Sequence, residues 1–217
     1  MILYFYPQPF ACSLQKPAAF ALTLRFPRDR IAPHPRIQRF SGDIMEKALI
    51  VYYSRKGENY MPGGIQVLEK GNTAYAAEHI ARAVDADLFE IDTVKPYAEN
   101  YRECCLEAVA ELKENARPAI QGYVEDLSAY GTIFVCFPSW CGTAPMCVFT
   151  FLEHYDLRGK RIAPLCTNEG SGMGNSEKHL AEICKGATIL PGLSVPGHQA
   201  KDSFEAISNW AKACLNA

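Results

Sequence analysis

The sequence has no long apolar run, no paired-cysteine motif and no histidine cluster, and each absence removes a class of protein. No stretch approaches the ~18 consecutive apolar residues of a membrane-spanning helix, so we expect no membrane association. The nine cysteines include no C-x-x-C pair, and several lie in apolar runs such as 134–137, which is typical of reduced thiols in a cytoplasmic protein. The five histidines show no metal-ligand spacing with one another or with cysteines, so we expect no metal site.

Charge is distributed unevenly along the chain. Of 22 basic and 24 acidic residues, six basic and two acidic ones precede residue 45, which leaves 16 basic and 22 acidic residues in the remainder. An acidic domain lacks the basic surface that binds a phosphate backbone, so we expect no nucleic-acid partner.

The chain changes character near residue 45. Residues 1–44 contain six prolines and show neither a helical nor a strand period. We interpret them as an N-terminal extension that is disordered or precedes the working start at Met45; a targeting or partner-binding arm is the alternative. Residues 45–217 form the predicted domain.

From residue 45 onward, short β-branched or aromatic runs alternate with amphipathic helical segments, which predicts an α/β fold. One helical stripe places Cys105, Val109 and Leu112 inward. Parallel strands joined by right-handed crossovers predict a doubly wound five-stranded sheet in a three-layer αβα arrangement. The strands are expected at 48–53, 87–91, 132–137, 161–166 and 188–195, the last broken at Pro191 and Gly192.

Three loops follow strands at the edge where doubly wound sheets bind ligands. Ser54-Arg55-Lys56-Gly57 follows the first strand, and Gly71-Asn72-Thr73 directly precedes a helix, which suits a phosphate because helix N-termini present unpaired N–H groups. An ordinary helix cap at Asn72 or Thr73 is the alternative. The G-x-x-x-x-G-K-[ST] spacing is absent, so we do not expect a nucleoside triphosphatase.

The other two loops combine small polar residues with one tryptophan. The loop 138–145 (PSWCGTAP) places Trp140 beside a predicted ligand site, where the ring forms a planar wall or instead folds back into the core. The loop 167–174 (TNEGSGMG) lies on the same rim, and its glycines do not make the G-x-G-x-x-G fingerprint of dinucleotide sites.

Together these motifs resemble the flavodoxin superfamily, in particular bacterial flavodoxin-like FMN-binding proteins, over nearly all of 45–217 and none of 1–44. The resemblance implies the flavodoxin-like strand order 2-1-3-4-5 and one noncovalently bound FMN. It implies that Ser54, Asn72 and Thr73, with the backbone of Gly71 and Ala74, hold the phosphate. Independently of the resemblance, we expect Arg55 or Lys56 to add a positive charge there. The isoalloxazine would be bordered by Pro138, Ser139, Trp140, Cys141 and Gly142, and Thr167, Gly170 and Ser171 would lie in the loop that closes the third side.

The chain departs from the usual compact S-x-T-G-N-T phosphate loop, because residues 55–70 separate Ser54 from Gly71. Either Gly71-Asn72-Thr73 completes the loop and 57–70 is an excursion, or residues 54–59 form the loop themselves. We prefer the first, since the helix dipole requires the donors directly before the helix. The excursion is expected to cover the flavin or a partner site.

The expected chemistry is electron transfer to a redox partner protein, or NAD(P)H-dependent reduction of a quinone-like acceptor by an FMN-dependent oxidoreductase. A cysteine-dependent hydrolase is an alternative, with Cys141 or Cys166 as nucleophile and His198 as the base to test; His154 and His179 fall within helical segments. A flavin-free scaffold on the same fold is the third possibility.

Overall fold

The computed structural model describes residues 47–217, and the predictions for residues 1–44 lie outside this part of the chain. The elements are β1 (Lys47–Tyr52), β2 (Gly57–Met61), β3 (Gly64–Leu68), α1 (Asn72–Ala83), β4 (Ala86–Glu90), α2 (Tyr101–Glu114), β5 (Tyr130–Pro138), α3 (Met146–Glu153), β6 (Arg161–Asn168), α4 (Ser176–Ile183), β7 (Thr188–Ile189), β8 (Leu193–Pro196), a 3-10 helix η1 (Gly197–Asp202) and α5 (Phe204–Leu215).

The main sheet is parallel throughout, with the order β4-β1-β5-β6 followed by β7 and β8, which both pair with β6. This order confirms the predicted 2-1-3-4-5 arrangement. The expected break in the last strand is also present, since Pro191 and Gly192 lie between β7 and β8. Proline has no N–H to donate to a ladder, so the strand resumes only after it.

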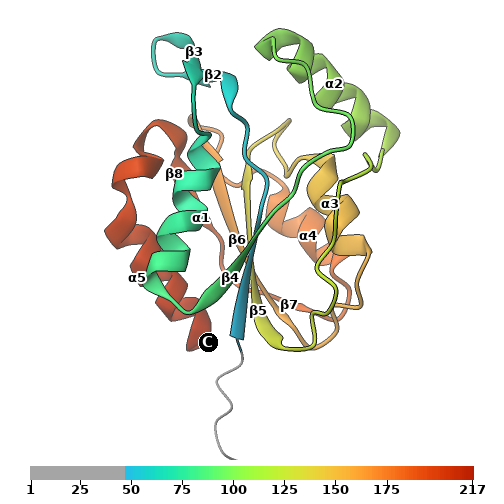
Figure 1. Ribbon diagram of the computed structural model, residues 1–217, viewed down its shortest axis with the longest axis vertical. Coiled ribbons are helices and arrows are strands. Elements are labelled where there is room, and N and C mark those ends of the chain that lie inside the picture. The colour runs from blue at the N-terminus through green and yellow to red at the C-terminus, as the bar shows by residue number, and fades with distance from the viewer. Residues whose placement is uncertain (1–46) are drawn as a thin grey trace, which may run out of the picture. The chain divides into compact units, whose positions relative to one another are not determined.

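Helices cover both faces of the sheet (Figure 1), and an apolar layer lies between the helices and the sheet on each face. On one face Ile50, Phe134 and Leu165 pack against Ile80 of α1 and Ile207 of α5. On the other face Val51, Val135 and Ile162 belong to a second cluster with side chains from α3 and α4. Because successive strand residues point to opposite faces, the continuous apolar runs of β1, β5 and β6 supply both layers.

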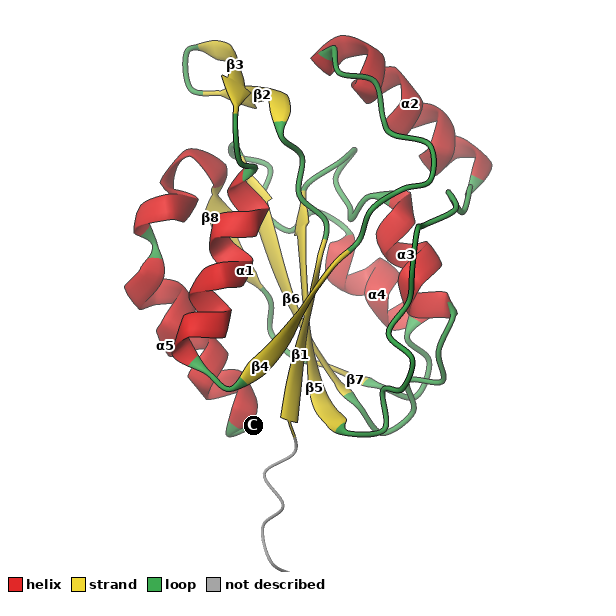
Figure 2. Ribbon diagram, viewed as in Figure 1, coloured by secondary structure: helices red, strands yellow, loops and turns green. Residues whose placement is uncertain are grey.

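The excursion between β1 and α1 is an antiparallel hairpin, β2–β3, closed by Pro62 and Gly63. Gly63 has φ +91°, which a residue with a side chain adopts only with strain, and proline before glycine is typical of a tight turn. The hairpin lies with α2 beyond the carboxyl ends of the strands (Figure 2).

Helix α2 faces the core with a different stripe from the predicted one. Cys104 and Ala108 are buried, whereas Cys105 and Val109, which we expected to point inward, are exposed. The expected inward position of Leu112 agrees with its packing against the core. The predicted positions Cys105 and Val109 are each one residue away from the buried positions Cys104 and Ala108. The reason is that α2 rests on the rim of the domain and buries less than a full apolar face.

Within residues 47–217, no helix combines the length and the apolar character that crossing a membrane requires. The same residues contain no cluster of histidine, cysteine and carboxylate side chains arranged to hold a metal ion.

Candidate functional site

A cleft of about 280 Å³ opens beyond the carboxyl ends of β1, β5 and β6. This is the edge where a doubly wound sheet reverses its winding and where ligands bind in such folds. Its lining comes from the loops after these three strands, the start of α1, the hairpin and one side of α2: Arg55, Asn59, Tyr60, Asn72, Thr73, Tyr101, Cys104, Cys105, Ala108, Val109, Pro138, Ser139, Trp140, Cys141, Thr167, Asn168, Glu169, Ser171 and Gly197.

The start of α1 is packed tightly on the end of β1. The Ala74 N–H donates to Ser54 Oγ at 3.0 Å, so a side chain from the loop after β1 satisfies one N–H of the first turn. The N-cap residue itself is Gly71, which has no side chain to cap the helix. A Cβ on Gly71 would lie 2.3 Å from both the Arg55 carbonyl oxygen and Ser54 Oγ, so glycine is required here for close approach. The first turn of α1 carries no acidic residue. This arrangement leaves a helix N-terminus suited to an anion.

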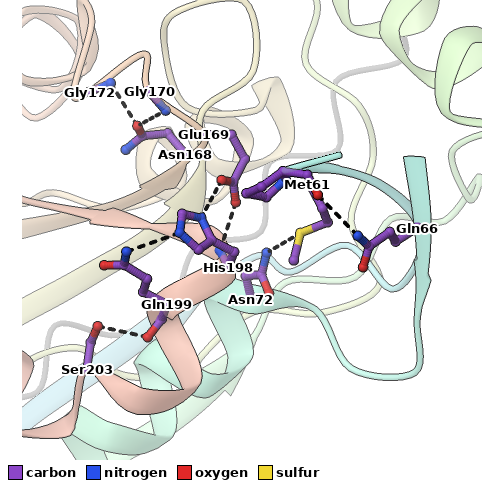
Figure 3. Close-up of polar contacts among 11 residues, drawn as sticks. Met61, Gln66, Asn72, Asn168, Glu169, Gly170, Gly172, His198, Gln199 and Ser203 are labelled. Atoms are coloured by element: carbon purple, nitrogen blue, oxygen red, sulfur yellow. Dashed lines mark hydrogen bonds and ion pairs between the residues drawn. The ribbon is translucent and has the colours of Figure 1, made fainter. Parts of the chain in front are cut away.

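Hydroxyl and amide groups add polar contacts at this end of the cleft. Thr73 Oγ1 lies 2.7 Å from Thr167 Oγ1, which joins the first turn of α1 to the end of β6. Asn72 Nδ2 contacts Met61 Sδ of the hairpin at 3.4 Å, as Figure 3 shows. The excursion therefore lies against the start of α1.

Arg55 places a positive charge in the same cleft. Its side chain is only 8% exposed, and it donates from Nε to the Glu58 carbonyl at 2.9 Å and from Nη2 to the Glu99 carbonyl at 2.7 Å. Both acceptors are neutral carbonyl oxygens. The guanidinium is therefore fixed in position while its charge remains available to an anion.

Trp140 forms a wall of the cleft and also packs on the core. Its ring meets Tyr53 and Tyr97 edge-to-face, with centroid distances of 5.4 and 4.8 Å. Trp140 and Thr143 exchange backbone hydrogen bonds around a two-residue turn in which Cys141 has φ +52° and Gly142 φ +76°. The Trp140 side chain therefore does both things considered from the sequence: it lines the cleft and it packs against the core.

The loop after β6 is organised by Asn168. Its Oδ1 accepts from the Gly170 and Gly172 N–H groups at 3.0 and 2.9 Å (Figure 3). Ser171 Oγ then donates to Ser139 Oγ at 2.9 Å, which links this loop to the end of β5.

Glu169 brings a carboxylate into the cleft. Its Oε1 accepts from the His198 N–H at 2.8 Å, and its Oε2 lies 2.7 Å from His198 Nδ1 (Figure 3). A Cβ on Gly197 would lie 2.7 Å from both Glu169 Oε1 and Asn72 Nδ2, so the two side chains approach this glycine together.

Helix α2 and the hairpin form a wall of the cleft. Sequence reasoning expected the excursion to cover the site, but it missed the hairpin pairing and the part played by α2. Glu58 Oε2 accepts from the Tyr101 N–H at 2.7 Å and from Asn100 Nδ2 at 3.2 Å, so the hairpin holds the N-terminus of α2. The rings of Tyr60 and Tyr101 stack at 6.4 Å. The Pro62-Gly63 dipeptide could have indicated the hairpin turn, but no local pattern connects Glu58 with α2.

The structure brings most of the predicted site residues to the cleft. Those in its lining are Arg55, Asn72, Thr73, Pro138, Ser139, Trp140, Cys141, Thr167 and Ser171. Ser54, Gly71, Gly142 and Gly170 lie in the adjoining loops and Ala74 lies in the first turn of α1; none of the five is part of the lining. The roles assigned to all of them remain predictions.

The described residues show no hydrogen bond between a cysteine and a histidine. Cys166 is buried, and burial raises the pKa of its thiol to about 12. His154 stacks on Tyr123, His179 Nδ1 lies 2.9 Å from Thr143 Oγ1, and His198 pairs with Glu169. A cysteine nucleophile requires an adjacent base, so this geometry does not favour the hydrolase alternative.

Comparisons with known proteins identify a family and several solved structures that this chain resembles. A family model described as flavodoxin matches residues 67–213. A protein described as a flavoprotein from Bacteroides uniformis is 29% identical, with a TM-score of 0.63 over 76% of this chain and 97% of that one. Another from Bacteroides eggerthii is 27% identical, with a TM-score of 0.56 over 75% and 98% of the two chains.

A third solved structure shows the same fold at lower identity. A flavoprotein from Lactobacillus acidophilus, in complex with FMN, is 23% identical, with a TM-score of 0.55 over 74% of this chain and 99% of that one. Among curated proteins, none matches this chain in sequence.

Proposed function

Because the chain belongs to the flavodoxin family, we propose that it binds one FMN noncovalently in the cleft and acts as a redox protein. The observation that carries the proposal is the pairing, in one cleft, of a helix N-terminus that has no acidic side chain in its first turn with an aromatic wall. The first suits a phosphate and the second suits a planar ring system. We propose residues 45–217 as the functional domain.

The residues present fit the two ends of FMN. At the phosphate end, the first turn of α1 carries no acidic side chain, Thr73 and Asn72 add polar atoms, and Arg55 adds a positive charge. At the ring end, Pro138, Ser139, Trp140 and Cys141 line the cleft, and the Asn168-centred loop closes a third side. The cleft volume of about 280 Å³ is close to the lower end of the range for small-molecule sites.

Bound FMN supplies transfer of one or two electrons, and the protein supplies position and electrostatics. Tyr53 and Tyr97 hold the Trp140 ring in one orientation. Thr73 and Thr167 tie the first turn of α1 to the end of β6, so two of the segments that line the cleft are held together. Arg55 neutralises part of the phosphate charge, whereas Glu169 adds a negative charge at the same end of the cleft.

We propose NAD(P)H-dependent reduction of a small quinone-like acceptor, with one-electron transfer to a partner protein as the second candidate. The first is favoured by the walls formed by the hairpin and α2, which rise beyond the strand ends and suit a small acceptor better than a flat protein surface. We place the protein in the cytoplasm, a proposal supported by the eight unpaired cysteines in the described part of the chain.

The decisive experiment titrates the full chain with FMN and follows flavin absorption and fluorescence. We expect quenched fluorescence and saturable binding, with weaker binding in Trp140→Ala. Trp210→Ala is the matched control, because this second tryptophan packs on Phe134 and donates to the Pro191 carbonyl at 3.0 Å, outside the cleft lining. Absence of FMN binding by the folded parent chain would overturn the proposal and favour the flavin-free scaffold.

Binding alone does not separate the two redox functions, so the loaded protein is then assayed for NAD(P)H oxidation with and without a benzoquinone acceptor. Acceptor-dependent oxidation supports the reductase. FMN binding without NAD(P)H oxidation favours the electron carrier.

A further inference from the structure

Two thiols stand apart from the other cysteines of the described chain. Cys105 and Cys141 are exposed, whereas Cys104, Cys136, Cys147, Cys166, Cys184 and Cys214 are buried. The two exposed thiols come from different elements, α2 and the turn after β5, and both line the cleft.

The backbone at Cys141 is unusual for a cysteine. Its φ of +52° lies in the left-handed region, which favours glycine, asparagine and aspartate. The Trp140–Thr143 backbone bonds hold the turn in this conformation. Left-handed residues with side chains cluster at functional sites, so the position is a candidate for a role of the thiol itself.

The surroundings of the pair distinguish the two sulfurs. Burial and then the neighbouring Cys105 raise the pKa of Cys141. Cys141 is therefore the poorer first nucleophile, because a raised pKa leaves less of its thiol as thiolate, and Cys105 attacks first.

We propose that Cys105 and Cys141 form a reversible intramolecular disulfide that ties α2 to the Trp140–Thr143 turn across the mouth of the cleft. The oxidant is a low-molecular-weight disulfide. The Cys105 thiolate attacks one of its sulfurs, which forms a mixed disulfide and releases one small thiolate. The Cys141 thiolate then attacks the Cys105 sulfur, which forms the protein disulfide and releases the second.

The electron and proton balance closes without a further reactant. The two cysteines lose two protons and two electrons, and the oxidant becomes two small thiols. Capping Cys105 in the first step also removes the charge that opposes ionisation of Cys141. Because a disulfide requires Cα atoms within about 7 Å, oxidation fixes α2 against the turn and narrows the cleft mouth.

The test treats the full-length protein with oxidised glutathione and maps the product by mass spectrometry. We expect the loss of two hydrogen atoms per chain and a disulfide-linked peptide that contains Cys141 and the α2 segment, both reversed by dithiothreitol. Cys105→Ser and Cys141→Ser are each expected to abolish the linkage and to retain a glutathione adduct on the remaining thiol.

Cys104 lies beside Cys105, so the Cys105→Ser variant also tests the choice of partner. Linkage that persists in this variant overturns the proposal, as do disulfides between chains or separate glutathione adducts without a linked peptide. Cys214→Ser is the control, because this buried cysteine of α5 lies outside the cleft lining, and it is expected to leave the linkage unchanged.

The effect on ligand access rests on the proposed FMN binding and is measured separately. We expect FMN release, followed by the return of flavin fluorescence on dilution, to be slower from the oxidised protein than from the reduced protein. Equal release rates from both would overturn the closure of the mouth. A protein that forms the disulfide but binds no FMN would refute the proposed function and leave the disulfide established.

Discussion

Replacing Gly71 with alanine tests the close approach that builds the phosphate end of the cleft. The new Cβ would lie 2.3 Å from the Arg55 carbonyl oxygen and from Ser54 Oγ, whereas ordinary contact begins at 3.4 Å. The loop must therefore open by about 1 Å. The Arg55 carbonyl also accepts from Asn59 Nδ2 at 3.1 Å, so it is held in place from the other side.

The expected cost has two parts. Overpacking of this kind costs about 1–3 kcal/mol, partly offset by about 0.4–1 kcal/mol because alanine restricts the unfolded chain. For FMN, misplacing one charge-assisted hydrogen bond at the start of α1 costs about 1.5–3 kcal/mol, which corresponds to an affinity loss of about ten- to a hundredfold.

The assay combines urea unfolding with FMN titration of the full chain. Gly122→Ala is the matched control, because its Cβ would meet no atom within 4 Å. We expect the control to bind FMN like the parent and to gain about 0.4–1 kcal/mol of stability, because alanine restricts its unfolded chain without a clash in the folded one. A Gly71→Ala protein with parental stability and FMN affinity would refute the close-approach argument.

Three further predictions concern charged side chains. Arg55→Gln is expected to weaken FMN binding and to reduce its salt dependence, because the fixed positive charge is lost. Arg158→Gln is the control, because Arg158 is exposed and pairs locally with Asp156. Equal losses of FMN affinity in both variants would contradict a specific role for Arg55. Glu169→Gln is expected to tighten FMN binding at neutral pH, since it removes a negative charge and keeps an acceptor for the His198 N–H; weaker binding would show that the Glu169–His198 pair dominates. Burial raises the pKa of Glu111 in the folded protein. Its ionisation therefore lowers the free energy of unfolding as pH rises from the unfolded-state pKa through the raised folded-state pKa. Glu111→Gln keeps an acceptor for Tyr97 and is expected to remove this loss when urea unfolding is compared at pH 4 and pH 7. If the difference in free energy of unfolding between the parent and Glu111→Gln were the same at pH 4 and pH 7, the raised pKa of Glu111 would be contradicted.

Strand pattern was predictable because each core strand is covered on both faces. Ile50, Phe134 and Leu165 lie in continuous apolar runs, and such runs with helical segments between them allow few arrangements. The break at Pro191 was predictable from the missing N–H. The site floor was predictable for the same reason: the residues that follow β1, β5 and β6 must meet at one edge of the sheet.

The walls of the cleft were not predictable from local patterns. Cys105 and Val109 carry the period of a buried stripe, but α2 lies on the rim and buries Cys104 and Ala108 instead. Its position depends on Glu58, more than forty residues earlier in the chain, which bonds the Tyr101 N–H. A hydrogen bond at that sequence separation leaves no period or spacing to detect.

The hairpin and α2 are coupled to the cleft through Arg55. This residue follows β1 by a short segment, lines the cleft and bonds the Glu58 carbonyl in the hairpin and the Glu99 carbonyl just before α2. A bound anion that attracts the guanidinium competes with neither carbonyl, because each uses a different nitrogen and one nitrogen, Nη1, remains. We therefore expect anion binding at the proposed phosphate end to favour the ordered arrangement of both walls, and ordered walls to favour binding by the same free energy.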